Sequence, residues 1–285
     1  MYTHLQQRDA ARQPVTLATL ARNKAEGRKI TSLTVYDASF AALVDAADID
    51  VALVGDSLGM VIQGFDTTVP VTMDQMVYHS AAVARGLSRA FLIGDLPFMS
   101  YSSREQALSN SVRLMQEGGA RMVKLESGGS QVEIVEFLAR HDIPVCAHLG
   151  LRPQSVHKTG GFRVQGREHE AADRMMADAR ALVAAGADLL LLECIPASLG
   201  KQITDASHVP VIGIGAGPDV DGQILVLYDI LDITSGRKPR FVRNFMSGDG
   251  ICGAGTSGQG GCAGAIERYA AAVRDRSYPA PEHCF

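Results

Sequence analysis

Several apolar runs in this chain of 285 residues end in a side chain that could act as an acid, a base or a metal ligand. A buried strand that ends in a polar residue places that residue at the rim of a hydrophobic core, which is where parallel barrels build their active sites. The repetition predicts one site assembled from several strand ends. The runs are VALVGD, FLIGD, MVKLE, VCAH and LLLLE, and they end at Asp56, Asp95, Glu126, His148 and Glu193.

Three of these residues are carboxylates at successive strand ends. Asp56, Asp95 and Glu126 would repel one another unless a cation lay between them. An all-oxygen ligand set suits Mg²⁺, which keeps bound waters and leaves room for a chelating substrate. The alternative is that each carboxylate only caps the following helix. Three carboxylates in register favour the metal site, and direct and water-bridged coordination both remain open.

Two neighbouring residues could hold an anionic substrate. Lys124 lies two residues before Glu126 on the same strand, so both side chains point to the same face. A buried lysine is costly unless it is paired, which favours contact with a substrate anion or an ion pair with one of the three carboxylates. Ser57 follows Asp56 and could donate a hydrogen bond to a substrate carboxylate.

The last two strand ends provide candidates for proton transfer. Glu193 follows an apolar run, and desolvation raises the basicity of such a carboxylate, which suits a general base. The alternative is a salt bridge to a loop arginine, Arg152 or Arg167. His148 could polarise a carbonyl group or only hold neighbouring groups in place.

Alternating strand and helix patterns must position these residues. Apolar runs without period-two alternation are typical of parallel strands buried on both faces. Eight such units without a linker predict a single-domain (β/α)₈ TIM barrel over 1–285, with a short helix before strand one; an open doubly wound sheet is the alternative. Thr72 with Gln75, Ser103 with Gln106 and Ser130 with Glu133 predict helix caps. The predicted strands are 29–37, 51–54, 90–94, 121–126, 144–148, 188–193, 210–215 and, more weakly, 239–242.

Three segments fall outside this repeat. Residues 1–13 carry no periodic pattern and are predicted to form a loose arm. The glycine-rich stretch 248–265 is predicted to be a flexible loop before the last helix. The connection after strand five is about twenty residues long and could be a lid. GIGAG at 213–217 is by itself a weak signal for phosphate binding and is more typical of a tight turn.

Composition indicates a small-molecule ligand. The net charge is −4 and no basic stripe is present, which argues against nucleic acid or an acidic membrane surface as a partner. The first 30 residues are polar, so we expect no signal peptide and no membrane span. Five cysteines without a C-x-x-C pair favour a reduced, cytoplasmic setting.

Long motifs in order resemble the ketopantoate hydroxymethyltransferase family. The resemblance spans about 30–245, and the motifs that carry it are TVYDASFA, LVGDSLGMVIQG, VPVTMDQMVYH, DLPFMSY, VKLE, PVCAHLGLRPQSV, GGFRVQGR, LLLLECIP, PVIGIGAG and DGQILVLYD. It implies a (β/α)₈ barrel that uses Mg²⁺ and assembles as a homo-oligomer, commonly a decamer. It also implies an aldol-type addition of a one-carbon unit from 5,10-methylenetetrahydrofolate to 3-methyl-2-oxobutanoate.

The resemblance assigns roles to the same strand-end residues. Asp56 and Asp95 match the family's metal-binding aspartates, and Glu126 matches its metal-associated glutamate. Glu193 matches the proposed proton acceptor, and His148 matches an active-site position of undefined role. Ser57 and Lys124 match positions that hold the keto acid, and the cations Lys158, Arg163 and Arg167 in the long loop could meet the glutamate carboxylates of folate.

Two other readings use the same residues. The phosphoenolpyruvate mutase and isocitrate lyase group also chelates α-oxo acids on Mg²⁺, so the fold and the carboxylates alone do not exclude it. A non-catalytic barrel that binds an oxo acid would have no need for three carboxylates, a lysine and a further glutamate at its strand ends.

Overall fold

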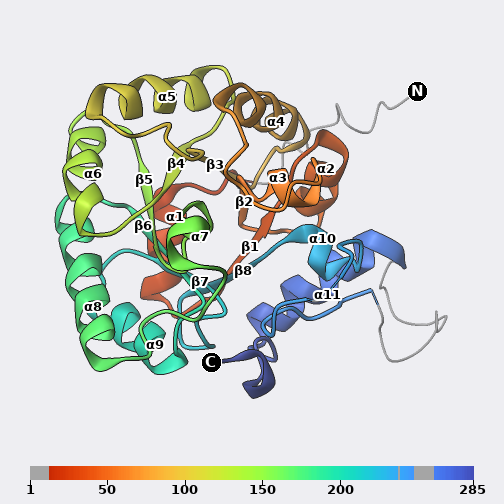
Figure 1. Ribbon diagram of the computed structural model, residues 1–285. Coiled ribbons are helices and arrows are strands. Elements are labelled where there is room, and N and C mark those ends of the chain that lie inside the picture. Colours follow the sequence, from red (N-terminus) through yellow and green to blue (C-terminus); the bar gives the residue numbers. More distant parts are fainter. Residues whose placement is uncertain (1–12, 237, 247–259) are drawn as a thin grey trace.

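The computed structural model describes residues 13–236, 238–246 and 260–285, and within these ranges eight parallel strands close into a barrel. Figure 1 looks down the barrel, with the strands in the centre and a ring of helices around them. Each strand pairs with the next one in the chain, and β8 pairs with β1 to close the circle. The predicted TIM barrel is therefore confirmed, as is the short helix before strand one.

Strands and helices alternate along most of the chain, except that no helix separates β7 from β8. The strands are β1 (Ile30–Thr34), β2 (Val51–Val54), β3 (Phe91–Asp95), β4 (Met122–Glu126), β5 (Val145–Gly150), β6 (Leu189–Glu193), β7 (Val211–Ile214) and β8 (Gly222–Leu225). The helices are α1 (Leu17–Ala25), α2 (Ala38–Ala46), α3 (Leu58–Val61), α4 (Met73–Gly86), α5 (Arg104–Gln116), α6 (Val132–Ala139), α7 (Val156–Thr159), α8 (His169–Ala184), α9 (Ala197–Ala206), α10 (Leu227–Ile230) and α11 (Gly261–Arg274). Among the described residues, short 3₁₀ turns lie at Gly129–Gln131, Pro153–Ser155 and Pro281–His283.

The strands are buried almost throughout, because helices cover the outside of the barrel and side chains fill its inside. This explains why the strands read as continuous apolar runs in the sequence. The seam between β1 and β8 is further held by Tyr269 of α11. Its hydroxyl group donates to the carbonyl oxygens of Ser32 and Gln223, at 2.8 and 2.9 Å.

The helix caps follow the sequence signals unevenly. Thr72 and Gln75 form the predicted reciprocal capping box at the start of α4. Ser103 accepts from the backbone N–H of Gln106 as expected, whereas the Gln106 side chain accepts from Ser102. The predicted cap at Ser130 is wrong. A 3₁₀ turn precedes α6 there, and the Ser130 hydroxyl bonds to Gln131 instead.

Strand eight is Gly222–Leu225, and the prediction of a strand at 239–242 is wrong. The true strand has four residues and begins with glycine, so it resembles a turn in the sequence. Glycine is needed because a Cβ atom at Gly222 would lie 2.5 Å from the carbonyl oxygen of Ile30 on β1. Residues 239–242 form turns outside the barrel.

The two irregular segments lie mostly outside the described residues. Of the predicted arm 1–13, only Gln13 is described. Of the predicted loop 248–265, residues 248–259 lie outside the described ranges. Residues 261–265 belong to α11, so the loop prediction is wrong for them. The long connection after β5 contains a 3₁₀ turn and the short helix α7.

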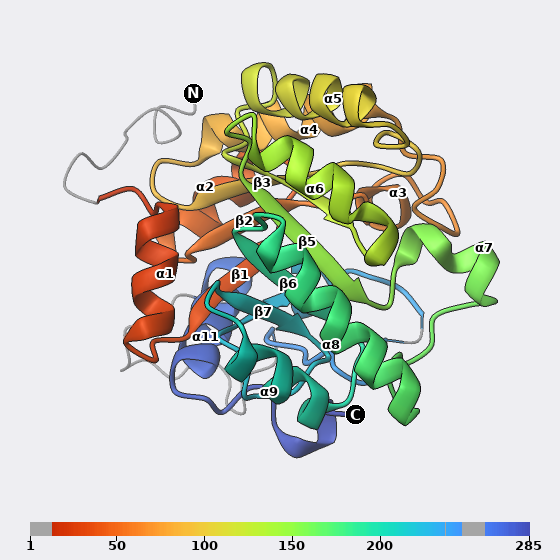
Figure 2. The same cartoon turned by 90° about the vertical axis from the view of Figure 1, so that its left-hand side faces the viewer.

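The barrel has two distinct ends, because all its strands run in the same direction. Figure 2 places α1 beside the starts of the strands and places α3 and α7 at the opposite end. The five strand-end residues singled out in the sequence all lie at the carboxyl end, on or just after β2 to β6. No helix in the described part of the chain is long and apolar enough to cross a membrane.

Candidate active site

Asp95 and Lys124 form a buried ion pair at the centre of the carboxyl end. They are direct partners in the register of β3 and β4, and Lys124 Nζ lies 2.5 Å from Asp95 Oδ2. Burial raises the pKa of Asp95 to about 7, although Lys124 opposes this shift. Burial also works against the charge on Lys124, but Asp95 and the carboxylates around it raise the pKa of the lysine above its usual value. The site therefore holds a charged lysine and carboxylates that ionise reluctantly.

Gln154 links the other two carboxylates of the predicted metal site. Its side-chain Nε2 donates to Asp56 Oδ2 at 2.8 Å and to the carbonyl oxygen of Leu96 at 3.0 Å. Its backbone N–H donates to the Glu126 carboxylate, at 2.9 and 3.2 Å. The Tyr101 hydroxyl donates to Gln154 Oε1 at 2.6 Å. One buried residue of the loop after β5 thus connects the ends of β2, β3 and β4.

The three carboxylates lie close enough to influence one another. The Asp56 backbone N–H donates to Asp95 Oδ2 at 3.3 Å. Burial raises the pKa of Glu126 well above its usual value, and the negative charge of Asp56 adds to this effect. Such mutual repulsion is what a bound cation would relieve.

The fit to a metal ion depends on how many protein ligands it needs. Within the described residues, no three His, Cys, Asp or Glu side chains come together as a complete ligand set. Mg²⁺ does not require one, because it keeps several waters and uses one or two carboxylates together with the substrate. Asp95 Oδ1 is buried and has no hydrogen-bond partner in the described chain. This unpartnered oxygen fits a hard cation, with Asp56 as its neighbour.

The Ser57 hydroxyl contacts a residue that follows β1, at the same end of the barrel as the carboxylates. It lies 2.9 Å from the hydroxyl of Tyr36, which follows β1 and is buried. Burial raises the pKa of Tyr36 above its usual range, so the phenol stays protonated and one of the two hydroxyls can donate to a ligand. Sequence reasoning missed Tyr36, although it too follows an apolar strand.

Glu193 and His148 form the second part of the site. His148 Nε2 lies 3.2 Å from Glu193 Oε2, yet neither ring nitrogen has a hydrogen-bond partner in the described chain. Burial lowers the pKa of His148 well below its usual value, so the contact joins a neutral ring and a carboxyl group. Burial also raises the pKa of Glu193 to about 7, a value suited to accepting a proton near neutral pH.

The backbone around Glu193 is tightly constrained. Gly150, at the end of β5, has φ +96°, and a Cβ atom there would lie 2.1 Å from the carbonyl oxygen of Glu193. Only glycine therefore lets β5 and β6 approach at this point. Cys194 adopts the left-handed region with φ 49°, which is unfavourable for a residue with a side chain. These features fix the direction in which the Glu193 side chain leaves the strand.

The structure places the predicted site residues in two groups at one end of the barrel. Asp56, Asp95, Lys124 and Glu126 lie together, and His148 contacts Glu193. Among the described residues, Glu193 forms no salt bridge with Arg152 or Arg167; it contacts His148 instead. Gln154 was missed because it lies in a loop, where no periodic pattern marks it.

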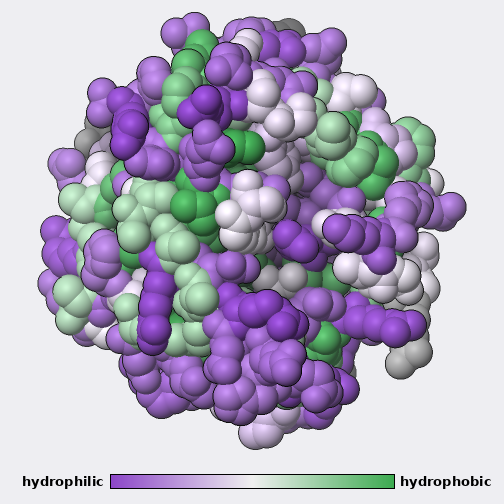
Figure 3. Space-filling model, turned by 60° about the vertical axis from the view of Figure 1, so that its left-hand side comes forward, coloured by the Kyte–Doolittle hydropathy of each residue, from purple (hydrophilic) through white to green (hydrophobic). Residues whose placement is uncertain are grey.

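A small pocket of about 190 Å³ leads to this site from outside. Glu126 and Gln154 lie at its base, and Phe98, Met99 and Arg152 are among the other residues that line it. Phe98 and Met99 are unusually exposed for apolar side chains. The molecular face in Figure 3 likewise carries separate hydrophobic patches among hydrophilic residues, with a lower part that is almost entirely hydrophilic.

Comparison with known proteins decides the family. The model of the ketopantoate hydroxymethyltransferase family matches residues 14–281. The chain belongs to this family. As a ketopantoate hydroxymethyltransferase family member, it is 58% identical to the 3-methyl-2-oxobutanoate hydroxymethyltransferase of Alkalilimnicola ehrlichii, over 96% of this chain and 95% of the relative. It is 50% identical to the protein of the same name from a Janthinobacterium species, over the full length of both.

Solved structures share the fold of this family member at low sequence identity. Phosphonopyruvate hydrolase matches with a TM-score of 0.56 and 16% identity, covering 74% of this chain and 79% of that one. A 2,3-dimethylmalate lyase of the phosphoenolpyruvate mutase and isocitrate lyase superfamily matches with a TM-score of 0.54 and 17% identity, covering 73% and 80%. At this identity the likeness supports the barrel fold and does not support the alternative reaction.

Proposed function

We propose that this chain transfers a hydroxymethyl group from 5,10-methylenetetrahydrofolate to 3-methyl-2-oxobutanoate and so produces ketopantoate. Relatives of that name, similar over nearly the whole chain, support the reaction. The structural observation that carries it is Glu193, a largely buried carboxyl group whose pKa burial raises to about 7, against the opposing charge of Lys124. A base of this strength can remove the weakly acidic proton next to a ketone.

Asp56 and Asp95 are the residues that would hold Mg²⁺, with Glu126 placed to bind one of its waters. A solved structure of phosphonopyruvate hydrolase contains oxalate and Mg²⁺, which is consistent with a barrel of this fold accommodating the ion beside a small dicarboxylate. When bound, the ion would stabilise the negative charge that develops on the keto oxygen of the substrate. The Lys124 ammonium group and the Ser57 hydroxyl would hold the substrate carboxylate.

Glu193 takes the proton from C3 of the keto acid. The C3–H bond breaks, the proton moves to a Glu193 oxygen, and the electron pair is shared between C3 and the keto oxygen. Water adds to the methylene carbon of the folate, both of its C–N bonds break, and the carbon is released as formaldehyde while tetrahydrofolate leaves. C3 then bonds to the formaldehyde carbon, and the former carbonyl oxygen takes up a proton to become the hydroxyl group. His148, being neutral and in contact with Glu193 Oε2, orients this carboxyl group.

The co-substrate would enter over the loops at the carboxyl end. Lys158 lies on α7, and Arg163 and Arg167 lie in the segment that follows it; all three are exposed. None of their side chains forms an ion pair with a described residue, so they are available to the glutamate carboxylates of folate. The exposed rings and chains of Phe98 and Met99 could contact an apolar part of the same molecule.

The family resemblance also supports a cytoplasmic homo-oligomer, most simply a decamer. Light scattering coupled to gel filtration tests this proposal directly. A particle with the mass of ten chains would support it, and a monomer would contradict it.

Product analysis tests the proposed reaction. We expect the protein, mixed with 3-methyl-2-oxobutanoate, 5,10-methylenetetrahydrofolate and Mg²⁺, to form ketopantoate, as detected by mass spectrometry. Asp95→Ala should form far less. Absence of the product with the wild-type protein, or equal yields from both proteins, would contradict the proposal.

A further inference from the structure

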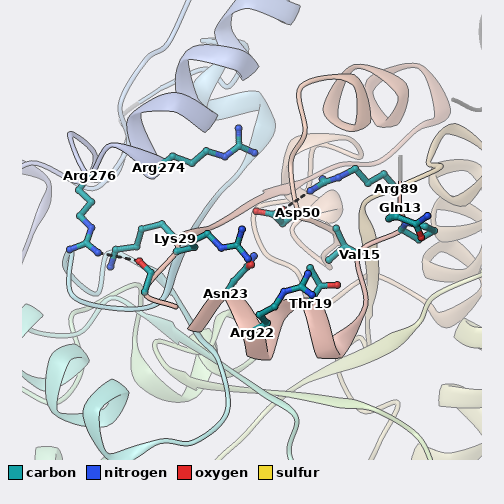
Figure 4. A pocket seen from close by; sticks show the side chains of 13 residues that line it. Gln13, Val15, Thr19, Arg22, Asn23, Lys29, Asp50, Arg89, Arg274 and Arg276 are labelled. Atoms are coloured by element: carbon teal, nitrogen blue, oxygen red, sulfur yellow. Dashed lines mark hydrogen bonds and ion pairs between the residues drawn. The ribbon is translucent and has the colours of Figure 1, made fainter. Parts of the chain in front are cut away.

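A second concave region lies at the amino end of the barrel, opposite the candidate active site. This pocket has a volume of about 690 Å³ and is lined by residues from α1, from the segments before β1 and β3, and from the end of α11. Figure 4 shows Arg22 on α1, Arg89 beside Asp50, and Arg274 and Arg276 near α11 on different sides of it. Its basic residues are Arg22, Arg28, Lys29, Arg89, Arg274 and Arg276.

The charge of this pocket is opposite to that of the chain. The whole chain carries a net charge of −4, yet among the described lining residues Asp50 is the only acid. Both oxygens of Asp50 are already engaged. Oδ1 accepts from Arg89 at 2.9 Å, and Oδ2 accepts from the backbone and hydroxyl groups of Thr31, at 3.1 and 3.0 Å. Asp50 therefore neutralises Arg89, and no other acidic residue among the described lining residues balances the charge of the remaining cations.

Most of the other basic side chains contact only neutral carbonyl oxygens. Lys29 Nζ donates to the carbonyl groups of Pro218 and Val220. Arg274 and Arg276 donate to the carbonyl oxygens of Asp48 and Gly27, at 2.5 and 3.2 Å. These bonds fix the side chains in place without removing their charge.

Two arginines complete the set. The Arg22 side chain has no hydrogen bond or ion pair with any part of the chain that the structure describes. Arg28 pairs at 2.6 Å with Glu26, which does not line the pocket. The pKa of Lys29 is lowered, first by burial and then by the positive charge of Arg276, while Asp221 and Asp219, which do not line the pocket, partly oppose this shift. The cations thus repel one another, and a bound anion would relieve this repulsion.

We propose that this pocket binds a phosphorylated small molecule with at least two phosphate groups. Arginine presents a planar fork of donors that matches phosphate oxygens in a bidentate manner. The cations come from separate elements, so a ligand with one phosphate would reach only some of them. The pocket volume lies within the range of about 300–1,000 Å³ that small organic ligands occupy. A confined pocket on a chain of negative net charge does not suit nucleic acid.

Calorimetric titration of the full-length protein tests this inference, with EDTA present and ionic strength held constant. The probes are ADP, pyrophosphate, inorganic phosphate and citrate. We expect ADP and pyrophosphate to bind once per chain and at least about tenfold more tightly than inorganic phosphate, because a second phosphate group forms further charged hydrogen bonds with the arginines. Absence of binding would overturn the inference. Equal affinity for citrate would overturn the preference for phosphate.

Matched variants locate the binding. The double variant Arg22→Gln with Arg276→Gln should weaken pyrophosphate binding by about tenfold or more. Arg140→Gln with Arg174→Gln removes the same charge from exposed helix positions elsewhere and should change the affinity less than about twofold. A similar loss in both double variants would overturn the assignment to this pocket. The single variant Arg22→Gln repeats the test with a smaller change, and thermal melting checks that each variant is folded.

Discussion

The two ends of the barrel use charged residues in opposite ways. At the amino end, acidic side chains are saturated with hydrogen bonds: Asp45 accepts from Ser88 Oγ and from the backbone N–H groups of Arg89 and Ala90. At the carboxyl end, Asp95 Oδ1 and both ring nitrogens of His148 are buried without a hydrogen-bond partner in the described chain. Saturated carboxylates stabilise a fold, whereas unsaturated ones cost stability and are available for chemistry.

The largest carboxyl pKa shifts follow the same division, although burial also raises the pKa of Asp188 at the amino end. Burial raises the pKa of Asp95, Glu126 and Glu193 at the carboxyl end. The amino end instead collects basic residues around an open pocket. Substitutions at the carboxyl end should therefore change activity more than stability. Substitutions of the fully hydrogen-bonded acidic residues at the amino end should change stability more than activity.

The largest expected effect is that of Asp95→Asn on activity. Loss of the proposed metal-binding charge should lower kcat/KM by about a thousandfold or more, because metal-ion catalysis contributes several kcal/mol. Steady-state kinetics at increasing Mg²⁺ concentration measures this. Activity within a few-fold of the wild type at any Mg²⁺ concentration would contradict a ligand role.

Asp45→Ala should show the opposite behaviour. It removes three hydrogen bonds and leaves the buried N–H of Ala90 unpaired, so the free energy of unfolding should fall by about 2–4 kcal/mol. The specific activity of the folded enzyme should not change. Urea denaturation measures the loss, and Asp74→Ala serves as a control. Asp74 is exposed and, among the described residues, pairs with Arg113 alone, so its removal should cost less than about 1 kcal/mol.

Gln154→Leu tests whether the hydrogen bonds of the Gln154 side chain at the carboxyl end support Mg²⁺ binding. The variant removes the donors to Asp56 and Leu96 but keeps the backbone bond to Glu126. We expect Mg²⁺ affinity to fall about 10–100-fold, the usual effect of losing a partner of a metal ligand. Tyr101→Phe removes only the bond to Gln154 Oε1 and should have a smaller effect. Equal effects would show that Gln154 does not act through Asp56.

The pH profile gives the smallest of these effects. Glu193 must be ionised to accept a proton, and its pKa is about 7. We therefore expect kcat/KM to fall about tenfold for each pH unit below about 7. Because the folded-state pKa is raised, the contribution of this group to stability is greatest in acid and is lost as the pH rises through about 7. A flat activity profile between pH 5 and about 7 would contradict the role of Glu193 as the base.

The sequence predicts the barrel well because buried parallel strands leave an unmistakable pattern. LLLLE and FLIGD each identify a strand and the candidate site residue at its end. The pattern fails at β8, where Gly222 replaces an apolar side chain because the backbone of β1 approaches so closely. It also fails at Ser130, where a 3₁₀ turn takes the place of a cap.

Only those residues of the candidate site that lie at strand ends could be predicted from the sequence. Asp95 and Lys124 could be paired from their positions, since neighbouring parallel strands bring their ends together. The role of Gln154 could not be predicted from the sequence, because its five hydrogen bonds depend on how the loop after β5 folds over the barrel. The amino-end pocket could not be predicted from the sequence either, because its arginines come from distant segments of the chain.

The central claim, that Glu193 removes the C3 proton of 3-methyl-2-oxobutanoate, is tested most directly by isotope exchange. Proton NMR in D₂O, with Mg²⁺ and without folate, follows the replacement of that proton by deuterium. We expect the wild-type protein to catalyse the exchange and Glu193→Gln to be about 10²–10⁴-fold slower. No exchange with the wild-type protein, or an equal rate with the variant, would contradict this account.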